Sequence, residues 1–169
     1  MPQYYHGTTL HEAYEIAKIQ RIKSPWYKQI AQLEKICANR PDIRATLQPD
    51  IKAAALKMTS LSYTTKELEH RVKSISLSTN FSLAQSYTRN NGAILGFELD
   101  PSKMAGTRVY HDILFVQGEI SLEKLKQVYF NQITLVSKKI ADLLRNYSEV
   151  KYFILQPDGN HTDISLQLK

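Results

Sequence analysis

The chain has little cysteine and no long apolar run. One cysteine among 169 residues excludes an internal disulfide framework and a zinc site built from several cysteines. That residue, Cys37, follows Leu33 and Ile36 with helical spacing, so we expect a buried thiol with a structural role. No stretch approaches the ~18 consecutive apolar residues of a membrane-spanning helix, so we expect no membrane span.

Several nucleotide-binding and metal-binding motifs are also missing from the sequence. There is no Gly-x-Gly-x-x-Gly and no P-loop, so we do not expect a glycine-rich helix start to hold phosphates. The pairs His-x-x-x-His and His-Glu-x-x-His are missing, as is the Gly-x-Ser-x-Gly elbow, so nothing indicates a zinc or serine hydrolase. The first residues, Met1 to Tyr4, do not form a cationic stretch before an apolar one, so we expect no secretory signal peptide.

The charge of the chain is unevenly distributed. The formal net charge is +6, and residues 21–73 hold 11 Lys and Arg against 5 Asp and Glu, which leaves 11 of each sign elsewhere. Such a basic lobe can attract an acidic protein surface, a nucleic acid or an anionic membrane. It can equally be a solvated helical face, because aromatic and basic residues do not interleave as they do on platforms for single-stranded nucleic acid.

The residue pattern predicts a single α+β domain over residues 1–169, with an N-terminal helical lobe at about 24–73. Tyr4 and Tyr5 are expected in a short strand, His6–Thr8 in a tight turn, and Thr9 at the start of a helix with a capping box to Glu12. We expect further strands at 74–78, 93–99, 113–116, 126–130, 133–136 and 151–155, helices at 81–88 and 137–147, an irregular loop at 101–112 and a turn at 157–160. Early helices followed by mostly antiparallel strands are typical of the α+β class.

The first motif that can carry chemistry is Tyr4-Tyr5-His6-Gly7-Thr8-Thr9. A histidine followed by glycine presents an imidazole beside an open stretch of backbone, which a ligand can approach closely because glycine has no Cβ. A backbone amide and carbonyl suit a carboxamide, which offers one donor and one acceptor. The structural alternative is a core or turn histidine.

The second motif runs from Ser74 to Asn80 and on to Tyr87. Period-two alternation predicts a strand that ends at Ser78, and Thr79 or Asn80 can cap the following helix. Ser76, Ser78 and Thr79 are therefore candidate site residues, and Tyr87 lies about ten residues further on. The structural alternative is a strand end, a helix cap and a core aromatic side chain.

The third motif is Gln117-Gly118-Glu119, which follows an expected core strand. Folding does not need a carboxylate at this point, but a fixed carboxylate can stabilise an oxocarbenium-like sugar cation and hold a ribose 2′-hydroxyl. The structural alternative is an exposed glutamate at a strand end.

In this order and spacing, the three motifs resemble the ADP-ribosyltransferase superfamily over residues 3–20 and 73–130. The resemblance implies a split, strongly bent antiparallel sheet around an NAD cleft. It implies an NAD-dependent mono-ADP-ribosyltransferase that moves ADP-ribose to a macromolecular target and releases nicotinamide. Small stand-alone domains of this kind are most often bacterial toxins or effectors, located in the cytoplasm or carried into a host cell without a signal peptide.

The resemblance also implies a role for each motif residue. In catalysis, Glu119 would stabilise the oxocarbenium state, His6 would position the ribose and Gln117 would orient the acceptor. Ser78 and Thr79 would support Glu119. The residues expected to bind NAD are His6, Gly7, Thr8, Ser78, Thr79 and Tyr87, and no metal is implied. The acceptor would be a protein or a nucleic acid, with the basic lobe 21–73 as the surface that recognises it.

Two alternatives stay open at this point. The first motif follows the His-Tyr-Glu branch of the superfamily and Gln-x-Glu follows the Arg-Ser-Glu branch, so the acceptor residue is not fixed. The opening Tyr-His-Gly-Thr is also similar to that of rifampicin ADP-ribosyltransferases and of RNA 2′-phosphotransferases, although His70 and Arg71 are poorly placed to supply a phosphotransferase cleft. An RNA 2′-phosphotransferase-like enzyme is therefore one alternative, and a catalytically inactive module that binds NAD or ADP-ribose is the other.

Overall fold

The computed structural model describes residues 1–24, 74–88 and 90–169, and the structural statements below concern these ranges. The expected helical lobe lies almost wholly outside them, as does Cys37. The described chain is a mixed α/β structure with an eight-stranded, mostly antiparallel sheet and few helices. The predicted class of mixed α and β structure with mostly antiparallel strands is confirmed at this level.

The large sheet has the strand order β10-β9-β8-β4-β1-β3-β6-β5. Only the contact between β8 and β9 is parallel. A second sheet pairs β2 with β7. The strands are β1 (Gln3–Thr9), β2 (Arg21–Lys23), β3 (Ser74–Ser78), β4 (Gly92–Glu98), β5 (Thr107–Tyr110), β6 (Ile113–Gln117), β7 (Glu119–Ser121), β8 (Leu125–Phe130), β9 (Lys151–Leu155) and β10 (His161–Asp163).

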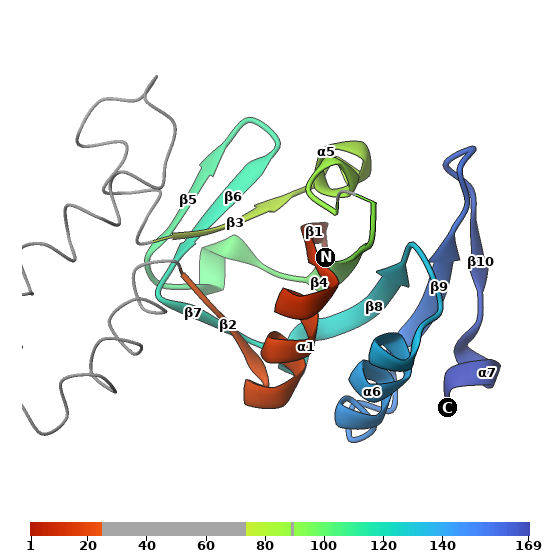
Figure 1. Ribbon diagram of the computed structural model, residues 1–169. Helices are drawn as coiled ribbons and strands as arrows, with labels where there is room; N and C mark the ends of the chain where they lie inside the picture. Colours follow the sequence, from red (N-terminus) through yellow and green to blue (C-terminus); the bar gives the residue numbers. More distant parts are fainter. Residues whose placement is uncertain (25–73, 89) are drawn as a thin grey trace, which may run out of the picture.

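The large sheet is weakly joined between β1 and β3. Strand β1 pairs with β4 along seven residues, and β3 pairs with β6 along five. Between β1 and β3, the only pair of opposed residues in the described chain is Tyr5 with Ser78. Figure 1 shows β3, β5 and β6 on one side of β1, and β8, β9 and β10 on the other. We call this junction the division between β1 and β3.

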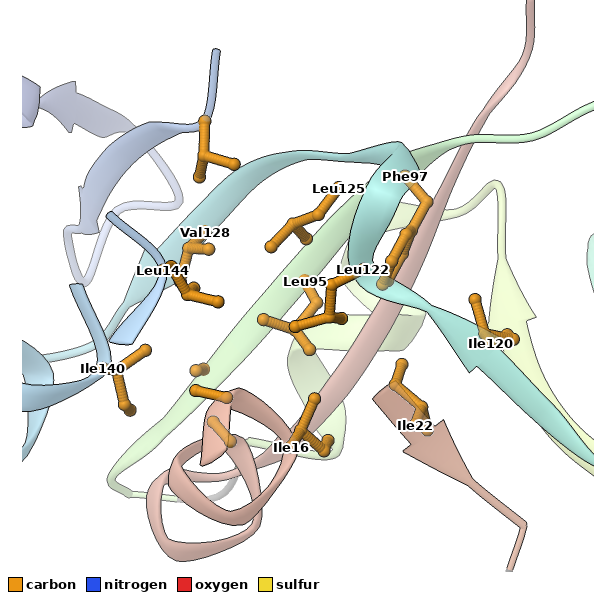
Figure 2. Close-up of a cluster of buried hydrophobic side chains, with 14 of the residues drawn as sticks. Ile16, Ile22, Leu95, Phe97, Ile120, Leu122, Leu125, Val128, Ile140 and Leu144 are labelled. Atoms are coloured by element: carbon orange, nitrogen blue, oxygen red, sulfur yellow. The ribbon is translucent and has the colours of Figure 1, made fainter. Parts of the chain in front are cut away.

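One face of the sheet, the core face, is covered by helices and by the small sheet. Helices α1 (Leu10–Ile19) and α6 (Leu135–Leu143) pack against each other on this face. Figure 2 shows Ile16 of α1, Ile140 and Leu144 of the α6 segment, strand residues Leu95, Phe97, Leu125 and Val128, Leu122 of η2 (Leu122–Lys124), and Ile22 with Ile120 of the small sheet gathered into one buried cluster.

The opposite face, which we call the outer face, carries Tyr5, Gly7, Ile94 and Tyr129 on neighbouring strands. The short helix α5 (Phe81–Ser86) lies against this face at β1 and β3. Helix α7 (Ser165–Leu168) lies near β9, and η1 (Pro101–Lys103) precedes β5. Helix α5 therefore covers the outer face where β1 lies beside β3.

Helix α1 forms as its sequence predicts. The Thr9 hydroxyl oxygen accepts a hydrogen bond of 3.2 Å from the Glu12 backbone amide, which satisfies one of the free amides of the first turn. The buried residues of the helix, which recur with helical spacing, are Leu10, Ala13, Ile16 and Ala17. Strands β3 and β9 also begin and end where they were predicted.

The expected tight turn at His6–Thr8 is wrong, because these residues continue β1 and pair with Leu95, Ile94 and Ala93 of β4. Glycine is required at position 7 for a different reason. A Cβ atom on Gly7 would lie 1.7 Å from the carbonyl oxygen of Ala84, so the backbone of α5 occupies the space that a side chain would need. Gly7 thus allows a helix to contact a strand, backbone against backbone.

Two further predictions are wrong in the second half of the chain. Residues 101–112, expected to be irregular, contain η1 and the edge strand β5. Residues 133–136, expected to form a strand, instead lead into α6, because Thr134 and Ser137 form a capping box in which the Thr134 hydroxyl accepts from the Ser137 amide at 3.3 Å. Helix α6 consequently begins and ends earlier than the predicted 137–147.

Replacing Gly7 by alanine tests the contact between α5 and β1. Because the new Cβ would overlap the Ala84 backbone, Gly7→Ala is expected to lower the free energy of unfolding by more than the ~1–3 kcal/mol of ordinary overpacking. The measurement is urea denaturation. The matched control is Gly96→Ala, whose Cβ would lie 3.0 Å from the flexible end of Gln127 and should cost less. A Gly7→Ala protein as stable as the native chain would contradict the contact.

Candidate functional site

The His6 side chain bridges the division between β1 and β3. Its Nδ1 atom lies 3.0 Å from the carbonyl oxygen of Ser76 on β3. A carbonyl oxygen can only accept, so Nδ1 carries the hydrogen and donates, and in the neutral ring Nε2 is the acceptor nitrogen. The first and second sequence motifs therefore meet through His6 and Ser76, even though seventy residues separate them in the chain.

The outer face continues from β1 across β3, β6 and β5 as rows of opposed residues. Directly opposed residues of antiparallel strands project to the same face. One row is Ser76, Phe115 and Arg108, and the next is Tyr5, Ser78, Ile113 and Tyr110. A third pairs Ser74 with Gln117. The intervening residues Ile75, Leu77, Leu114 and Val116 are buried on the core face.

Ser78, Thr79 and Asn80 form the link from β3 to α5. The Ser78 hydroxyl accepts a hydrogen bond of 2.9 Å from the Asn80 amide, and the Asn80 side chain caps α5 by accepting from the Leu83 amide at 3.2 Å. The Thr79 amide donates to the Asp112 carbonyl oxygen at 2.9 Å. These bonds give Ser78 and Thr79 a structural role, and they place both beside the turn between β5 and β6.

Tyr87 is the C-cap residue of α5, and its side chain is exposed rather than packed inward. It is 56% exposed, so the structural alternative of a core aromatic side chain is wrong. Ala84 of the same helix is buried, and its carbonyl lies over Gly7. The Tyr87 ring is therefore available to a ligand at the end of the helix that contacts the first motif.

Glu119 begins β7, just past the end of β6. Gly118, with a φ of 87°, turns the chain between the two strands. The Glu119 carboxylate oxygens lie 3.4 and 3.5 Å from a guanidinium nitrogen of Arg21 on β2. Both side chains are about half exposed, so this ion pair contributes at most ~1 kcal/mol to stability. Gln117, by contrast, is exposed and belongs to the outer face.

The structure contradicts the expected support of Glu119 by Ser78 and Thr79. Ser78 is opposed to Ile113 at the start of β6, whereas Gln117 is opposed to Ser74 at its end. Four residue steps along a strand span about 13 Å. The side chain that contacts Glu119 is instead Arg21. The motif residues Ser78 and Thr79, with Asp112 beside them, thus lie at one end of β6, and Gln117 and Glu119 lie at the other.

The described residues on either side of 25–73 both contact the third motif. The Ser24 amide donates to the Gly118 carbonyl oxygen at 3.0 Å, and Ser74 is opposed to Gln117. The hydroxyls of Ser24 and Ser74 are buried, and within the described ranges neither has a hydrogen-bond partner. The bend at residues 117–119 therefore holds both Ser24 and Ser74 in place. This structural role is the main alternative to a catalytic role for the third motif.

An aromatic cluster covers the outer face on the other side of α5. Its members are Tyr5, Phe81, Tyr129, Phe153 and His161, with neighbouring ring centroids 4.9 to 6.3 Å apart. Burial, with a smaller effect from Tyr5, raises the pKa of Tyr129 to about 12, and burial also raises the pKa of Tyr5. Both phenols therefore stay neutral at physiological pH. They donate to Gln127 and Gln3, at 3.1 and 2.7 Å.

Sequence reasoning missed two residues of this region, Arg108 and Asp112, because residues 101–112 were expected to be irregular. The signal was present. Thr107 to Tyr110 is rich in β-branched and aromatic residues, and only His111 and Asp112 separate it from the next strand, which is typical of a two-residue hairpin. His111 has a φ of 52°, as such a turn requires.

In the ranges 1–24, 74–88 and 90–169, no group of three His, Cys, Asp or Glu side chains could hold a metal ion. None of the helices described there is long and apolar enough to cross a membrane. Comparison with known proteins found no family model, no curated protein and no solved structure that matches this chain. The case for a function therefore depends on the residues and geometry above.

The aromatic cluster predicts how stability depends on alkaline pH. Since the folded pKa of Tyr129 is about 12, above the ordinary value of 10.0, the folded state holds a proton that the unfolded state loses first. The free energy of unfolding should therefore fall as the pH rises from about 10 towards 12, and Tyr129→Phe should reduce this decline. Urea denaturation at several pH values measures it. An identical decline in the Tyr129→Phe protein would show that Tyr129 does not titrate this way.

Proposed function

We propose that the chain is an NAD-dependent mono-ADP-ribosyltransferase whose site lies at the division between β1 and β3, where the His6 side chain meets β3. The observation that carries the proposal is the bridge from His6 to Ser76 across a sheet held at this junction by the single pair Tyr5 and Ser78. A split antiparallel sheet is what the resemblance implied. The two strands on either side of the split carry the first and second motifs.

The geometry supports specific tasks for the residues at the division. The hydrogen bond to Ser76 fixes the His6 ring with Nε2 as acceptor, which suits a ribose hydroxyl. Helix α5 already occupies the space over Gly7 on the outer face. The nicotinamide carboxamide would therefore reach the Gly7 backbone through the division, with Tyr87 at the end of α5 close to the ring.

The position of Gln117 supports a reaction at the open end of the division. Strands β1 and β3 are closed at Tyr5 and Ser78, and separate in the direction of Ser76 and Ser74. Gln117 lies opposite Ser74, so it is at this open end. From there it could orient an acceptor, which is a protein or a nucleic acid in this proposal. The basic stretch 21–73 is the proposed surface for recognising that target, as in a bacterial toxin or effector.

The reaction needs a carboxylate because a positive charge develops on the ribose. The bond between nicotinamide and ribose C1′ breaks with its electron pair leaving on nicotinamide, and the acceptor forms a new bond to C1′ and loses its proton to solvent or a base. Glu119 is the proposed carboxylate, which would turn from Arg21 towards the sugar. Asp112, at the closed end, is the competing carboxylate that the structure adds.

Nicotinamide release from NAD tests the proposal. The native protein should release nicotinamide, and Glu119→Gln should reduce the rate at least ~100-fold, the scale of losing one key electrostatic group. Asp112→Asn is the matched carboxylate variant at the other end of β6, and it should keep the rate within a few-fold. If Asp112→Asn lost nicotinamide release and Glu119→Gln kept it, the catalytic carboxylate would be Asp112, at the closed end of the division. If the native protein neither released nicotinamide nor bound NAD, the proposed function would be contradicted.

A charge swap separates catalysis by Glu119 from the structural use of its ion pair. In the double variant Arg21→Glu with Glu119→Arg, the two charges still face each other across β2 and β7, so a merely structural pair would be restored. A catalytic carboxylate would not be restored, and nicotinamide release should stay as low as in Glu119→Gln. Recovery of the native rate in the double variant would show that Glu119 acts only through Arg21.

The alternative of an RNA 2′-phosphotransferase-like enzyme is favoured by one observation. Such an enzyme needs additional cationic residues along its cleft, and Arg108 lies in the same row as Ser76. The two activities are separated by their products, because a phosphotransferase moves an RNA 2′-phosphate to NAD. This alternative would be favoured if the protein transferred phosphate from a 2′-phosphorylated RNA to NAD faster than it released nicotinamide from NAD alone.

A further inference from the structure

Strand β5 is one edge of the large sheet and presents unpaired backbone groups along its free side. Figure 1 shows it beside β6, at the end of the sheet away from β10. The Gln117 amide on β6 donates to the Gly106 carbonyl oxygen at 3.1 Å. Because bonded and non-bonded pairs alternate in antiparallel strands, every second residue of β5 after Gly106 bonds to β6. The backbone groups of Thr107 and Val109 therefore point away from β6, where the described chain has no further strand.

The free side of β5 is open at Val109 and covered near Thr107. The Thr107 hydroxyl lies 3.2 and 3.1 Å from the carbonyl oxygens of Pro101 and Met104, so η1 and the residues after it run beside this end of the strand. Val109 is opposed to Leu114 of the core face, yet its side chain is 56% exposed. The edge at Val109 thus combines free backbone groups with an exposed apolar side chain.

The neighbours of Val109 are an exposed cation and an exposed aromatic ring. Arg108 and Tyr110 both project to the outer face, and Tyr110 is 58% exposed. If a second copy of β5 lies antiparallel to the first with Val109 opposite Val109, Arg108 of each copy is opposite Tyr110 of the other. A guanidinium over a tyrosine ring makes a favourable cation–π contact. In this register the edge of β5 is therefore complementary to itself.

The other symmetric registers of two β5 strands are less favourable. A register centred on Arg108 would place two guanidinium groups directly opposite each other, which is destabilising. A register centred on Tyr110 would need His111 in extended backbone, but the φ of His111 is 52° and turns the chain. A register centred on Thr107 would bring the second strand against η1. The register centred on Val109 avoids all three problems.

We propose that two copies of this chain pair through β5, antiparallel about a two-fold axis at Val109, and so join their large sheets into one. At the axis, the Val109 amide of each copy donates to the Val109 carbonyl oxygen of the other, which satisfies the free groups of both edges. A two-fold contact uses the same surface on both copies, so the assembly stops at a dimer. A strand of four residues buries little area, so the dimer is weak. The inference is independent of the proposed function.

Sedimentation of the full chain from about 10 µM to about 1 mM, a range that covers weak association, tests the pairing. The native protein should change from monomer to dimer as its concentration rises. Val109→Lys would place two ammonium groups opposite each other at the axis and should raise the dissociation constant at least ~10-fold. The matched control is Thr162→Lys, which adds the same charge to an exposed position of β10, the other edge strand. It should dimerise as the native protein does.

Two substitutions of Tyr110 test the register. Tyr110→Glu would place a carboxylate opposite Arg108 of the second copy, and at low salt its dissociation constant should be at or below the native value. Tyr110→Lys removes the same ring but places a cation opposite Arg108, so its dissociation constant should rise at least ~10-fold. The two variants differ in the sign of the new charge, which isolates the contact with Arg108.

Three results would overturn the inference. One is a native protein that stays monomeric up to about 1 mM. Another is a dimer that Val109→Lys leaves intact. The third is a dimer that Tyr110→Glu and Tyr110→Lys weaken to the same extent. Because Val109, Tyr110 and Thr162 are exposed, each variant is expected to fold, which a thermal melt checks.

Discussion

The weak joint between β1 and β3 is the constraint on which the candidate site depends. Strand β1 pairs with β4 along seven residues and β3 with β6 along five, while in the described chain the only opposed residues between β1 and β3 are Tyr5 and Ser78. The core face stays continuous below, because side chains from both halves pack into one buried cluster. His6, which is opposed to Leu95 of the core face, spans this junction through its hydrogen bond to the Ser76 carbonyl oxygen.

The parts of the fold that the sequence predicts are those determined by local chemistry. Thr9 caps α1 through a neighbouring amide, and the alternation in Ser74–Ser78 produces β3 with the predicted bounds. The failures come from contacts that are distant in the chain. Gly7 was read as a turn, yet it is small because the Ala84 backbone lies over it. Strands β2 and β7 have three residues each, too few for a periodic signal, so only their pairing with each other reveals them.

The candidate site shows the same limit. The sequence identifies the residue types, and the order of the motifs is what suggests NAD chemistry, but strand register decides which residues are neighbours. Register brings Ser76 to His6 and Arg108 to Phe115, and it separates Ser78 from Glu119 by the length of β6. No local pattern contains the register of β3 on β6, since 34 residues lie between the paired positions Ser78 and Ile113.

The central claim is that NAD binds at the division between β1 and β3, and amide NMR during a titration with NAD tests it most directly. The predicted result is that the signals of His6, Gly7 and Ser76 shift together and saturate with one affinity. Signals of β10 (His161–Asp163), at the far edge of the sheet, should stay in place. Saturable shifts confined to other parts of the molecule, or no saturable shift at all, would contradict the claim.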